Sequence, residues 1–421
     1  MRSSPLTSLS YPGLSSIQFG PHPKAVRLDY LLHRLGGYAM SNLETEQPVS
    51  GRERIYALDV LRGFAMLGVL VAYCMWSLGT APDWSWSALN RWLGSNVVPL
   101  VIDFKFYTIL AFLFGLGFSI QLARASDDEA AVETYCRRLA VLAGIGLVHA
   151  LLLRNGDILL PYALTGFLLI PFRRVSARTL IISAFAVLAL ETAIRALWPI
   201  VGLPMFERPD LESAPYLVEN AAWVRYWYET APFNWPTNLT LFLFGFCAGR
   251  AQLLTRLERR PRALTLILAG GLAAGIAIYF ARLSFIERAG SSPLNDSIAT
   301  TLFTFHCWGM SSAYGATLLL IMRSKVGAAA VSPLAVIGKL ALTNYLLQSV
   351  IAVPVCLAFG LFDTFTPTRS LLFAAAILAV ELPFSLLWEK RFRFGPAEWL
   401  WRVLTYQRLP SMLKTRGDLA N

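Results

Sequence analysis

Apolar stretches of about 20 residues recur along nearly the whole chain after residue 56, and this repetition limits the fold more than any other feature. An α-helix needs roughly 20 apolar residues to cross the hydrocarbon core of a bilayer. A soluble core could contain one such helix, but not a long succession of them. Only 15% of the residues are charged, against about 25% in soluble domains. We therefore expect an all-α integral membrane protein.

The apolar stretches divide into ten predicted transmembrane helices, which make up a domain at 52–393. Residues 1–51 are rich in Ser, Pro and Gly and are predicted to form a flexible N-terminal extension. Residues 394–421 begin with an aromatic, basic stretch, which we expect to form an interfacial helix on the cytoplasmic face, followed by a tail. The ten predicted spans are 57–77, 98–123, 138–153, 157–172, 179–200, 235–255, 263–281, 297–322, 333–360 and 370–389.

Basic residues alternate between the two sides of the predicted helices. One set of loops contains clusters of them, whereas the other set contains scattered single arginines. Cytoplasmic loops carry the excess of Lys and Arg in membrane proteins, so both termini are predicted to be cytoplasmic. These clusters also account for the net charge of +11 without a nucleic-acid partner. They comprise Arg52 and Arg54; Arg124, Arg137 and Arg138; Arg173, Arg174 and Arg178; Arg250, Arg256, Arg259, Arg260 and Arg262; Arg323 and Lys325; and Lys390, Arg391 and Arg393.

The first predicted helix begins with an acid and a base, Asp59 and Arg62. A charge at the centre of a membrane helix costs roughly 2.5–3.5 kcal/mol on insertion scales, and such residues usually pair or face a cavity. The spacing of three residues places both side chains on one helix face. Two interpretations stay open: an ion pair that packs this helix against its neighbours, or a pair that faces a ligand.

Five motifs of the chain, taken in order, resemble the YeiB family of bacterial multi-pass membrane proteins, domain of unknown function 418. The resemblance covers about 52–408 and implies a multi-pass protein of the bacterial inner membrane. Lys339 departs from the family pattern, which has Arg there. The motifs are LDVLRG at 58–63; DFKFY with FLFGLGF at 103–118; His149 with GDIL at 156–159; GKLALTNYLLQS at 338–349; and GPAEWLWR at 395–402.

The opening LDVLRG motif is also similar, more distantly, to that of the heparan-alpha-glucosaminide N-acetyltransferase family. Those enzymes pass an acetyl group from cytosolic acetyl-CoA to a luminal amino sugar. Their catalytic histidine follows the first helix, whereas residues 72–98 here contain no histidine. The resemblance implies a membrane-bound acyltransferase with a cytosolic acyl-CoA donor and a periplasmic or membrane acceptor. The alternative is a transporter or exporter of a small metabolite, whose buried charges would bind substrate or protons.

His149 and Asp157 flank a short turn between two predicted helices. An antiparallel hairpin with so short a turn can bring the two side chains into hydrogen-bond contact on the periplasmic side. A carboxylate that orients a histidine raises its basicity, so the pair could act as a catalytic base. The alternative is structural: Asp157 would cap the second helix and His149 would bond to the backbone.

Seven further polar residues are candidates for a substrate or cofactor pocket, because each lies in or beside an apolar span: Asp59, Arg62, Asp103, Lys105, His306, Asn344 and Gln348. His306 could equally be a packing residue, and the acid at Glu381, just before Pro383, could be a proton site or part of a kink. The five cysteines stand far apart, so we expect no metal site. The expected partners are the lipid bilayer and a small-molecule substrate, and assembly into a homodimer stays open.

The loop at 201–234 is the largest on the predicted outer side and is rich in Trp and Tyr. Aromatic residues near a membrane boundary are often interfacial anchors. We expect a helix at about 215–231 that either lies on the outer surface or forms a lid over a substrate pocket.

Overall fold

The computed structural model describes residues 56–76, 78, 87–124, 128–202, 209, 215–362 and 364–414, so the predicted extension at 1–51 lies outside them. Within these ranges the chain is helical, and the β-structure is a single bridge between Phe392 and Leu413. The helices are α2 (Tyr56–Trp76), α3 (Ala88–Trp92), η2 (Leu93–Ile102), α4 (Lys105–Arg124), α5 (Asp128–Leu152), α6 (Leu159–Phe167), η3 (Ile170–Arg174), α7 (Ala177–Ile200), α8 (Tyr216–Glu229), α9 (Ala231–Asn234), α10 (Pro236–Arg250), α11 (Leu253–Glu258), α12 (Pro261–Ala289), α13 (Pro293–Ile321), α14 (Lys325–Lys339), α15 (Ala341–Phe359), α16 (Pro367–Arg391) and α17 (Pro396–Tyr406).

Seven helical segments in the described part of the chain are long and apolar enough to cross a membrane, and they coincide with seven of the ten predicted spans. The chain is therefore a multi-pass membrane protein. The other three predicted spans are also helical but do not meet both criteria. α6 and α10 are shorter than 18 residues, and α13 is long but rich in hydroxyl and small residues. Those three spans and the cytoplasmic location of the termini stay predictions.

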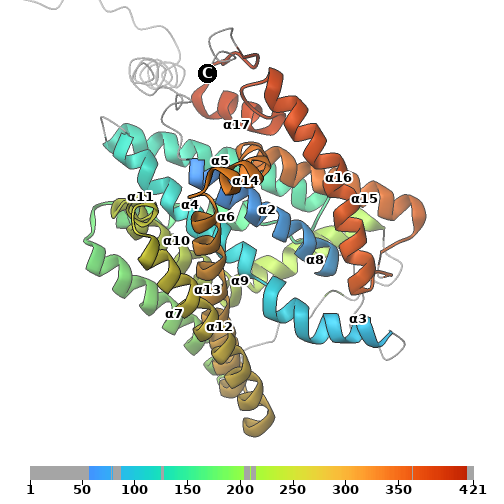
Figure 1. The fold of residues 1–421 in the computed structure, drawn as a ribbon. Helices are drawn as coiled ribbons and strands as arrows, with labels where there is room; N and C mark the ends of the chain where they lie inside the picture. Colours follow the sequence, from blue (N-terminus) through green and yellow to red (C-terminus); the bar gives the residue numbers. More distant parts are fainter. Residues whose placement is uncertain are drawn as a thin grey trace, which may run out of the picture. The chain divides into compact units, whose positions relative to one another are not determined.

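Helix α2 is the most buried of the seven spans and packs against α4, α14, α15 and α16 (Figure 1). Its contact with α14 is close because glycines face each other's backbone. A methyl group added to Gly63 would overlap the carbonyl of Leu334, and one added to Gly338 would overlap the carbonyl of Asp59. Small residues at a crossing let two helix backbones approach, and membrane helices depend on this packing.

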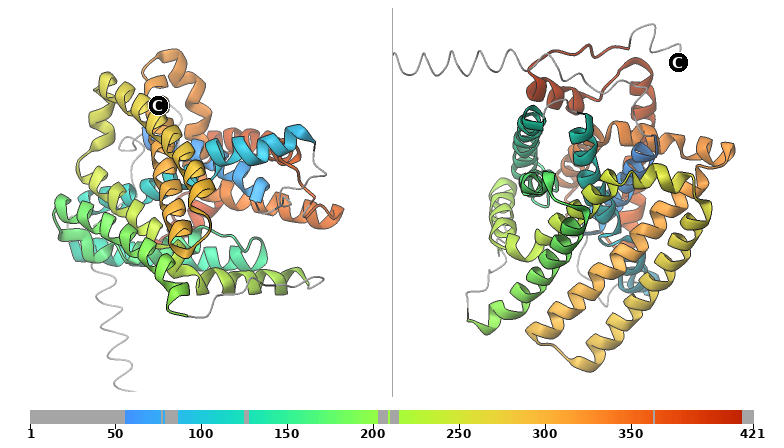
Figure 2. Two further views of the ribbon diagram at one scale, coloured as in Figure 1. Left: turned by 90° about the horizontal axis from the view of Figure 1, so that it is seen from below. Right: turned by 90° about the vertical axis from the view of Figure 1, so that its left-hand side faces the viewer.

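The other long pairings repeat this use of glycine. Helices α4 and α10 meet where added methyl groups on Gly115 and Gly245 would overlap backbone carbonyls of the partner helix. Helices α12 and α13 pack side by side (Figure 2), and their crossing lies at Gly271 and Gly309. Much of α12 faces outward with apolar side chains, as expected for a helix in contact with lipid.

Two predicted spans are interrupted, which corrects the sequence prediction. The span predicted at 333–360 is two helices, α14 and α15, that meet at Leu340, where the backbone has φ −104° and ψ 28°. The span predicted at 98–123 begins earlier, as the π-helix η2, and breaks before α4 at Phe104, which has a positive φ of 60°. Proline 99 inside η2 lacks a backbone N–H and so disturbs regular helical hydrogen bonding there.

Helix α17 forms where the interfacial helix was predicted, and it lies against α5 and α15. Its Trp401 donates a hydrogen bond to the carbonyl of Arg138 at 2.9 Å, and the Arg138 guanidinium stacks over the same ring. Arg137 donates to the carbonyl of Thr405 at 3.2 Å. Leu400 and Leu404 are exposed on α17, and its seat in the membrane interface stays a prediction.

The glycine contact between α2 and α14 can be tested with Gly63→Ala. The added methyl group meets a backbone carbonyl that cannot rotate away, and overpacking of this kind costs about 1–3 kcal/mol. We expect a lower melting temperature and a lower monodisperse yield in detergent. The matched control is Gly117→Ala in α4, where nothing lies within 4 Å of the added atom. That change should be neutral, or stabilising by up to about 1 kcal/mol.

The predicted orientation can be tested with fusions after Lys414. If the C-terminus is cytoplasmic, a fluorescent protein fused there will fluoresce and alkaline phosphatase will be inactive. A phosphatase fusion within 203–208, in the loop predicted to be outside, should be active. Activity of the C-terminal phosphatase fusion would reverse the assigned orientation.

Candidate functional site

A buried group of polar side chains surrounds His149, which lies in the last turn of α5. The turn after α5 brings Asp157 back to it, so that Oδ1 of Asp157 lies 2.8 Å from Nδ1 of His149. Both side chains are almost completely shielded from solvent. The hairpin thus brings together the two residues that the sequence analysis singled out.

Asp157 also performs the structural function that the sequence analysis considered as the alternative. Its Oδ2 accepts a hydrogen bond at 2.7 Å from the backbone N–H of Leu160, in the first turn of α6. This bond satisfies one of the free N–H groups at the start of that helix. The two interpretations are therefore compatible, because one carboxylate caps α6 and orients His149 at the same time.

Two residues of α15, Tyr345 and Ser349, complete the group. The Tyr345 hydroxyl donates to Oδ1 of Asp157 at 3.0 Å and accepts from the backbone N–H of Ile158 at 3.1 Å. The Ser349 hydroxyl lies 2.9 Å from Nε2 of His149. The sequence analysis did not select either residue for the site. The available signal was their spacing of four residues, which places them on one helix face within the 338–349 motif.

The hydrogen bonds determine which atoms carry protons. Because Tyr345 accepts from Ile158, its own proton points to Asp157. An ionised Asp157 can only accept hydrogen bonds, so in that state Nδ1 of His149 is the donor to it. A neutral imidazole with its proton on Nδ1 has the lone pair on Nε2, and there the Ser349 hydroxyl is the donor. The group therefore has the order hydroxyl, imidazole, carboxylate.

Helix α8 covers the end of α5 that carries His149. Tyr216 donates to the carbonyl of Leu153, and Asn220 donates to the carbonyl of Leu151. Asn220 and Val224 are buried, whereas Leu217 and others on the opposite face are exposed. Burial raises the pKa of Tyr216 and so keeps its hydroxyl a hydrogen-bond donor. The helix predicted at 215–231 thus has one face against α5 and one face exposed.

Asp59 and Arg62 form the expected ion pair at the contact of α2 with α14. Nη1 of Arg62 lies 3.3 Å from Oδ1 of Asp59 and also donates to the carbonyl of Gly338 at 3.4 Å. The Asp59 side chain is 3% exposed and that of Arg62 is 33% exposed. The pair therefore ties the 58–63 motif to the 338–349 motif, and the arginine keeps partial access to solvent.

The other predicted pocket residues belong to two further groups. Asp103 accepts from the indole of Trp76 at 2.8 Å, and Lys105 is fully buried with its ammonium bonded to the carbonyl of Pro99. In the same region of the structure, Lys105 lies over the ring of Phe303, one turn before His306. Nδ1 of His306 lies 2.8 Å from the carbonyl of Gly275, so this histidine joins α13 to α12.

Asn344 and Gln348 connect α15 to α16. Gln348 donates to the carboxylate of Glu381, with its nearer oxygen at 3.0 Å, and the Ser385 hydroxyl donates to the amide oxygen of Asn344 at 3.0 Å. The amide of Asn344 also donates to the carbonyl of Ile337 across the break at Leu340. Glu381 therefore has a partner on a neighbouring helix, as one of its two interpretations required.

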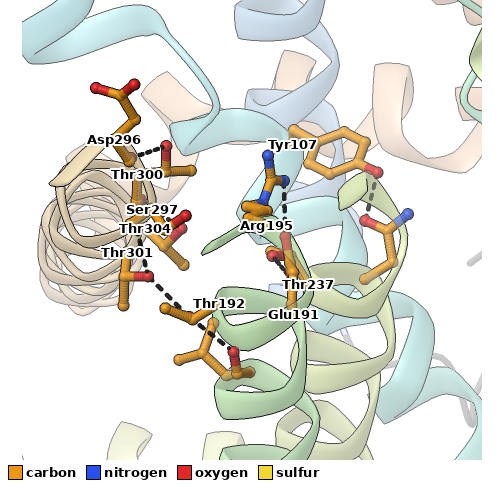
Figure 3. A network of polar contacts seen from close by, with 12 residues as sticks. Tyr107, Glu191, Thr192, Arg195, Thr237, Asp296, Ser297, Thr300, Thr301 and Thr304 are labelled. Carbon is orange, nitrogen blue, oxygen red and sulfur yellow. Dashed lines mark hydrogen bonds and ion pairs between the residues drawn. The ribbon is translucent and has the colours of Figure 1, made fainter. Parts of the chain in front are cut away.

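A polar network between α7, α10 and α13 was not predicted from the sequence (Figure 3). Glu191 accepts from Arg195 at 2.9 Å and from Thr237 at 2.6 Å, and these side chains point toward one another in the figure. One residue further on, Thr192 bonds to Thr301 of α13 at 2.9 Å. A neutralised and hydrogen-bonded acid of this kind is the form in which carboxylates tolerate an apolar bundle. We assign this network to packing of the three helices.

Two family models match the chain, and their matched regions overlap at residues 248–270. Residues 54–270 match the family described as heparan-alpha-glucosaminide N-acetyltransferase, catalytic, and residues 248–408 match the family described as protein of unknown function (DUF418). The first match contains His149 and Asp157, and the second contains Tyr345 and Ser349. The polar group around His149 is therefore assembled from both matched regions.

Three bacterial relatives match almost the whole chain. An uncharacterized 39.9 kDa protein in the amylase 3′ region of Bacillus acidopullulyticus is 30% identical, over 88% of this chain and 99% of its own length. The uncharacterized protein YxaH of Bacillus subtilis is 26% identical, over 86% of this chain and 96% of its own. The uncharacterized protein YeiB of Escherichia coli is 27% identical, over 86% and 99%.

The ion pair of α2 can be tested with Asp59→Asn, Arg62→Gln and the double variant. Each single change removes one charge and leaves a poorly hydrated partner. The two single changes together should therefore lower the free energy of unfolding by more than the double change does. We expect a coupling of about 1 kcal/mol or more from melting temperatures in detergent. The exposed pair Arg225 and Glu229, at 2.7 Å, is the control, with an expected coupling of about 0.5 kcal/mol or less. Additive effects at Asp59 and Arg62 would contradict the pairing.

Proposed function

Since the chain belongs to the YeiB family and half of it matches an acetyltransferase catalytic family, we propose that it is a membrane acyltransferase. The donor is a cytosolic acyl-CoA, and the acceptor is a hydroxyl or amine on the periplasmic side or within the membrane. His149 is the general base and Asp157 orients it. The membrane that contains the enzyme is the bacterial inner membrane.

The observation that carries this proposal is the contact of Asp157 with Nδ1 of His149 at 2.8 Å. It favours the tautomer that has its lone pair on Nε2, the nitrogen that faces the Ser349 hydroxyl. That nitrogen can take a proton from an attacking hydroxyl or amine, and the carboxylate stabilises the imidazolium that results. A positioned base of this kind contributes about 10²–10⁴-fold to a rate.

The basic residues on the predicted cytoplasmic side support an anionic donor. CoA carries phosphate groups, and a surface of one charge sign raises the local concentration of ligands of the opposite sign. Arg256, Arg259, Arg260 and Arg262 lie together at α11 and the start of α12. In this proposal Arg62, which is partly exposed, lies on the donor path with Asp59, and the buried polar residues of α15 line the acceptor path.

A transporter is the second candidate, and a specific observation favours it. The bundle contains a buried acid in an apolar span, Glu381, which is bonded to Gln348. Intramembrane acids of this kind mark substrate or proton paths in many carriers. A carrier would bind its cargo without cleaving a thioester, so the two candidates differ in a single measurement.

The measurement is CoA release by the purified protein in detergent. Acetyl-CoA is supplied with glucosamine as the acceptor probe, and free thiol is detected with a chromogenic disulfide. We expect release by the wild type and a loss of about 10²–10⁴-fold in His149→Gln, measured on variant protein that elutes as a monodisperse peak. His306→Gln is the control, since it changes a buried histidine of another group.

Two results would contradict the proposal. Full activity of His149→Gln would make this histidine a packing residue. Absence of thiol release with acetyl-CoA and with a long-chain acyl-CoA, together with accumulation of a labelled solute in proteoliposomes, would favour the transporter.

A further inference from the structure

We propose that Ser349 is the nucleophile of this site and carries the acyl group as a serine ester between the donor and the acceptor. This inference rests on the proposed acyl transfer and adds its mechanism: two chemical steps with a covalent intermediate rather than direct transfer. It rests on the geometry around His149, on the direction of the hydrogen bonds and on the position of Ser349 along α15.

The geometry is that of an activated hydroxyl. The Ser349 hydroxyl lies 2.9 Å from Nε2 of His149, whose Nδ1 lies 2.8 Å from Asp157. Both distances are within the range in which a base withdraws a proton from a nucleophile. Chain order does not matter for such a group, because the same arrangement occurs on unrelated folds with the residues in any order.

The direction of the Ser349 hydroxyl is unusual for a serine within a helix. Such hydroxyls often bond to the carbonyl three or four residues earlier, and this protein has several examples. Ser297 bonds to Pro293, Thr301 to Ser297, and Thr317 to Ala313. Ser349 instead points across to His149 on another helix. When His149 carries its proton on Nδ1, the Ser349 proton points at the lone pair that would remove it.

The helix that carries Ser349 also supplies a second residue of the site, Tyr345. Tyr345, one turn earlier, donates to Asp157, and its ring lies 4.9 Å from that of His149. Helix α15 therefore supplies the Ser349 hydroxyl at Nε2 of the imidazole. It also supplies the Tyr345 phenol, which bonds to the carboxylate at Nδ1. Helix α15 therefore contacts both the imidazole and the carboxylate, through Ser349 and Tyr345.

The place of Ser349 along α15 also bears on the proposed intermediate. Ser349 stands eight residues after the start of α15 and ten before its end, about 12 Å and 15 Å along the axis. The hydroxyl is thus near the middle of α15, and it meets His149 in the last turn of α5. In this proposal the acyl group waits on Ser349, so the donor and the acceptor need not be bound at the same time.

The two steps balance without any further reagent. In the first, Oγ of Ser349 bonds to the thioester carbonyl carbon while its proton moves to Nε2 of His149. The C–S bond then breaks, and the thiolate takes that proton and leaves as CoA. In the second, the acceptor gives its proton to Nε2 and attacks the ester carbonyl. The C–Oγ bond breaks, and the proton returns to Ser349.

The test is trapping of the intermediate. The wild-type protein is incubated with acetyl-CoA carrying a labelled acetyl group, without acceptor, then acid-quenched and digested for mass spectrometry. We expect acetyl on the peptide that contains Ser349, at close to one per chain, and a matching burst of CoA. Ser349→Ala and His149→Gln should reduce the label to background. Ser349→Cys should restore a label that neutral hydroxylamine removes.

The control is Ser370→Ala, another buried serine, which bonds to the carbonyl of Cys74 on α2. It should keep the label and the burst. Because Ser349→Cys reports through its own thioester, the experiment stays decisive even if the alanine variant does not fold.

A fluorophosphonate probe, which reacts with activated serines whatever the natural donor, separates this inference from the proposed function. Labelling of Ser349 by the probe without CoA release upholds the nucleophile and overturns the acyl-CoA donor. CoA release that persists in Ser349→Ala, with no acetyl on the wild-type peptide, overturns the nucleophile and keeps the proposed function. Failure of both the probe and the thioester assay overturns both.

Discussion

The arrangement of the site depends on one half-buried carboxylate, that of Glu398, which holds the break between α14 and α15 in place. Its Oε1 accepts from the backbone N–H groups of Leu342 at 2.7 Å and Thr343 at 3.0 Å, and its Oε2 accepts from the Thr343 hydroxyl at 2.5 Å. It thus caps a helix from a distant part of the chain. Burial raises the pKa of Glu398, and these hydrogen bonds oppose that effect.

The break lets one stretch of sequence serve two partners. Before it, Gly338 packs on α2 beside Asp59 and Arg62; after it, α15 directs Tyr345 and Ser349 toward α5. In a straight helix, the direction of Gly338 would fix the directions of Tyr345 and Ser349, because all three would follow one 3.6-residue period. The interruption separates the two requirements, so that the close contact with α2 and the hydrogen bonds to His149 and Asp157 are met independently.

The predictable parts are those in which a local pattern decides the structure. Length and hydropathy gave the helical class, and the short turn between His149 and Asp157 gave their contact. The break at Leu340 could not be predicted, because the side chain that stabilises it comes from α17. Ser349 was missed for a similar reason: its partner is 200 residues away, and only the packing of α5 on α15 joins them.

Helix α17 is attached to both helices that supply the site. Glu398 fixes it to the start of α15, and its contacts with Arg137 and Arg138 fix it to α5, eleven residues before His149. The attachment point on α5 therefore lies about 16 Å along that helix from the histidine. A displacement of this helix would therefore be transmitted to α5 and α15 together, the two helices that carry the imidazole and the hydroxyl. If α17 lies in the membrane interface as predicted, forces from the surrounding lipid headgroups would reach the site by this route.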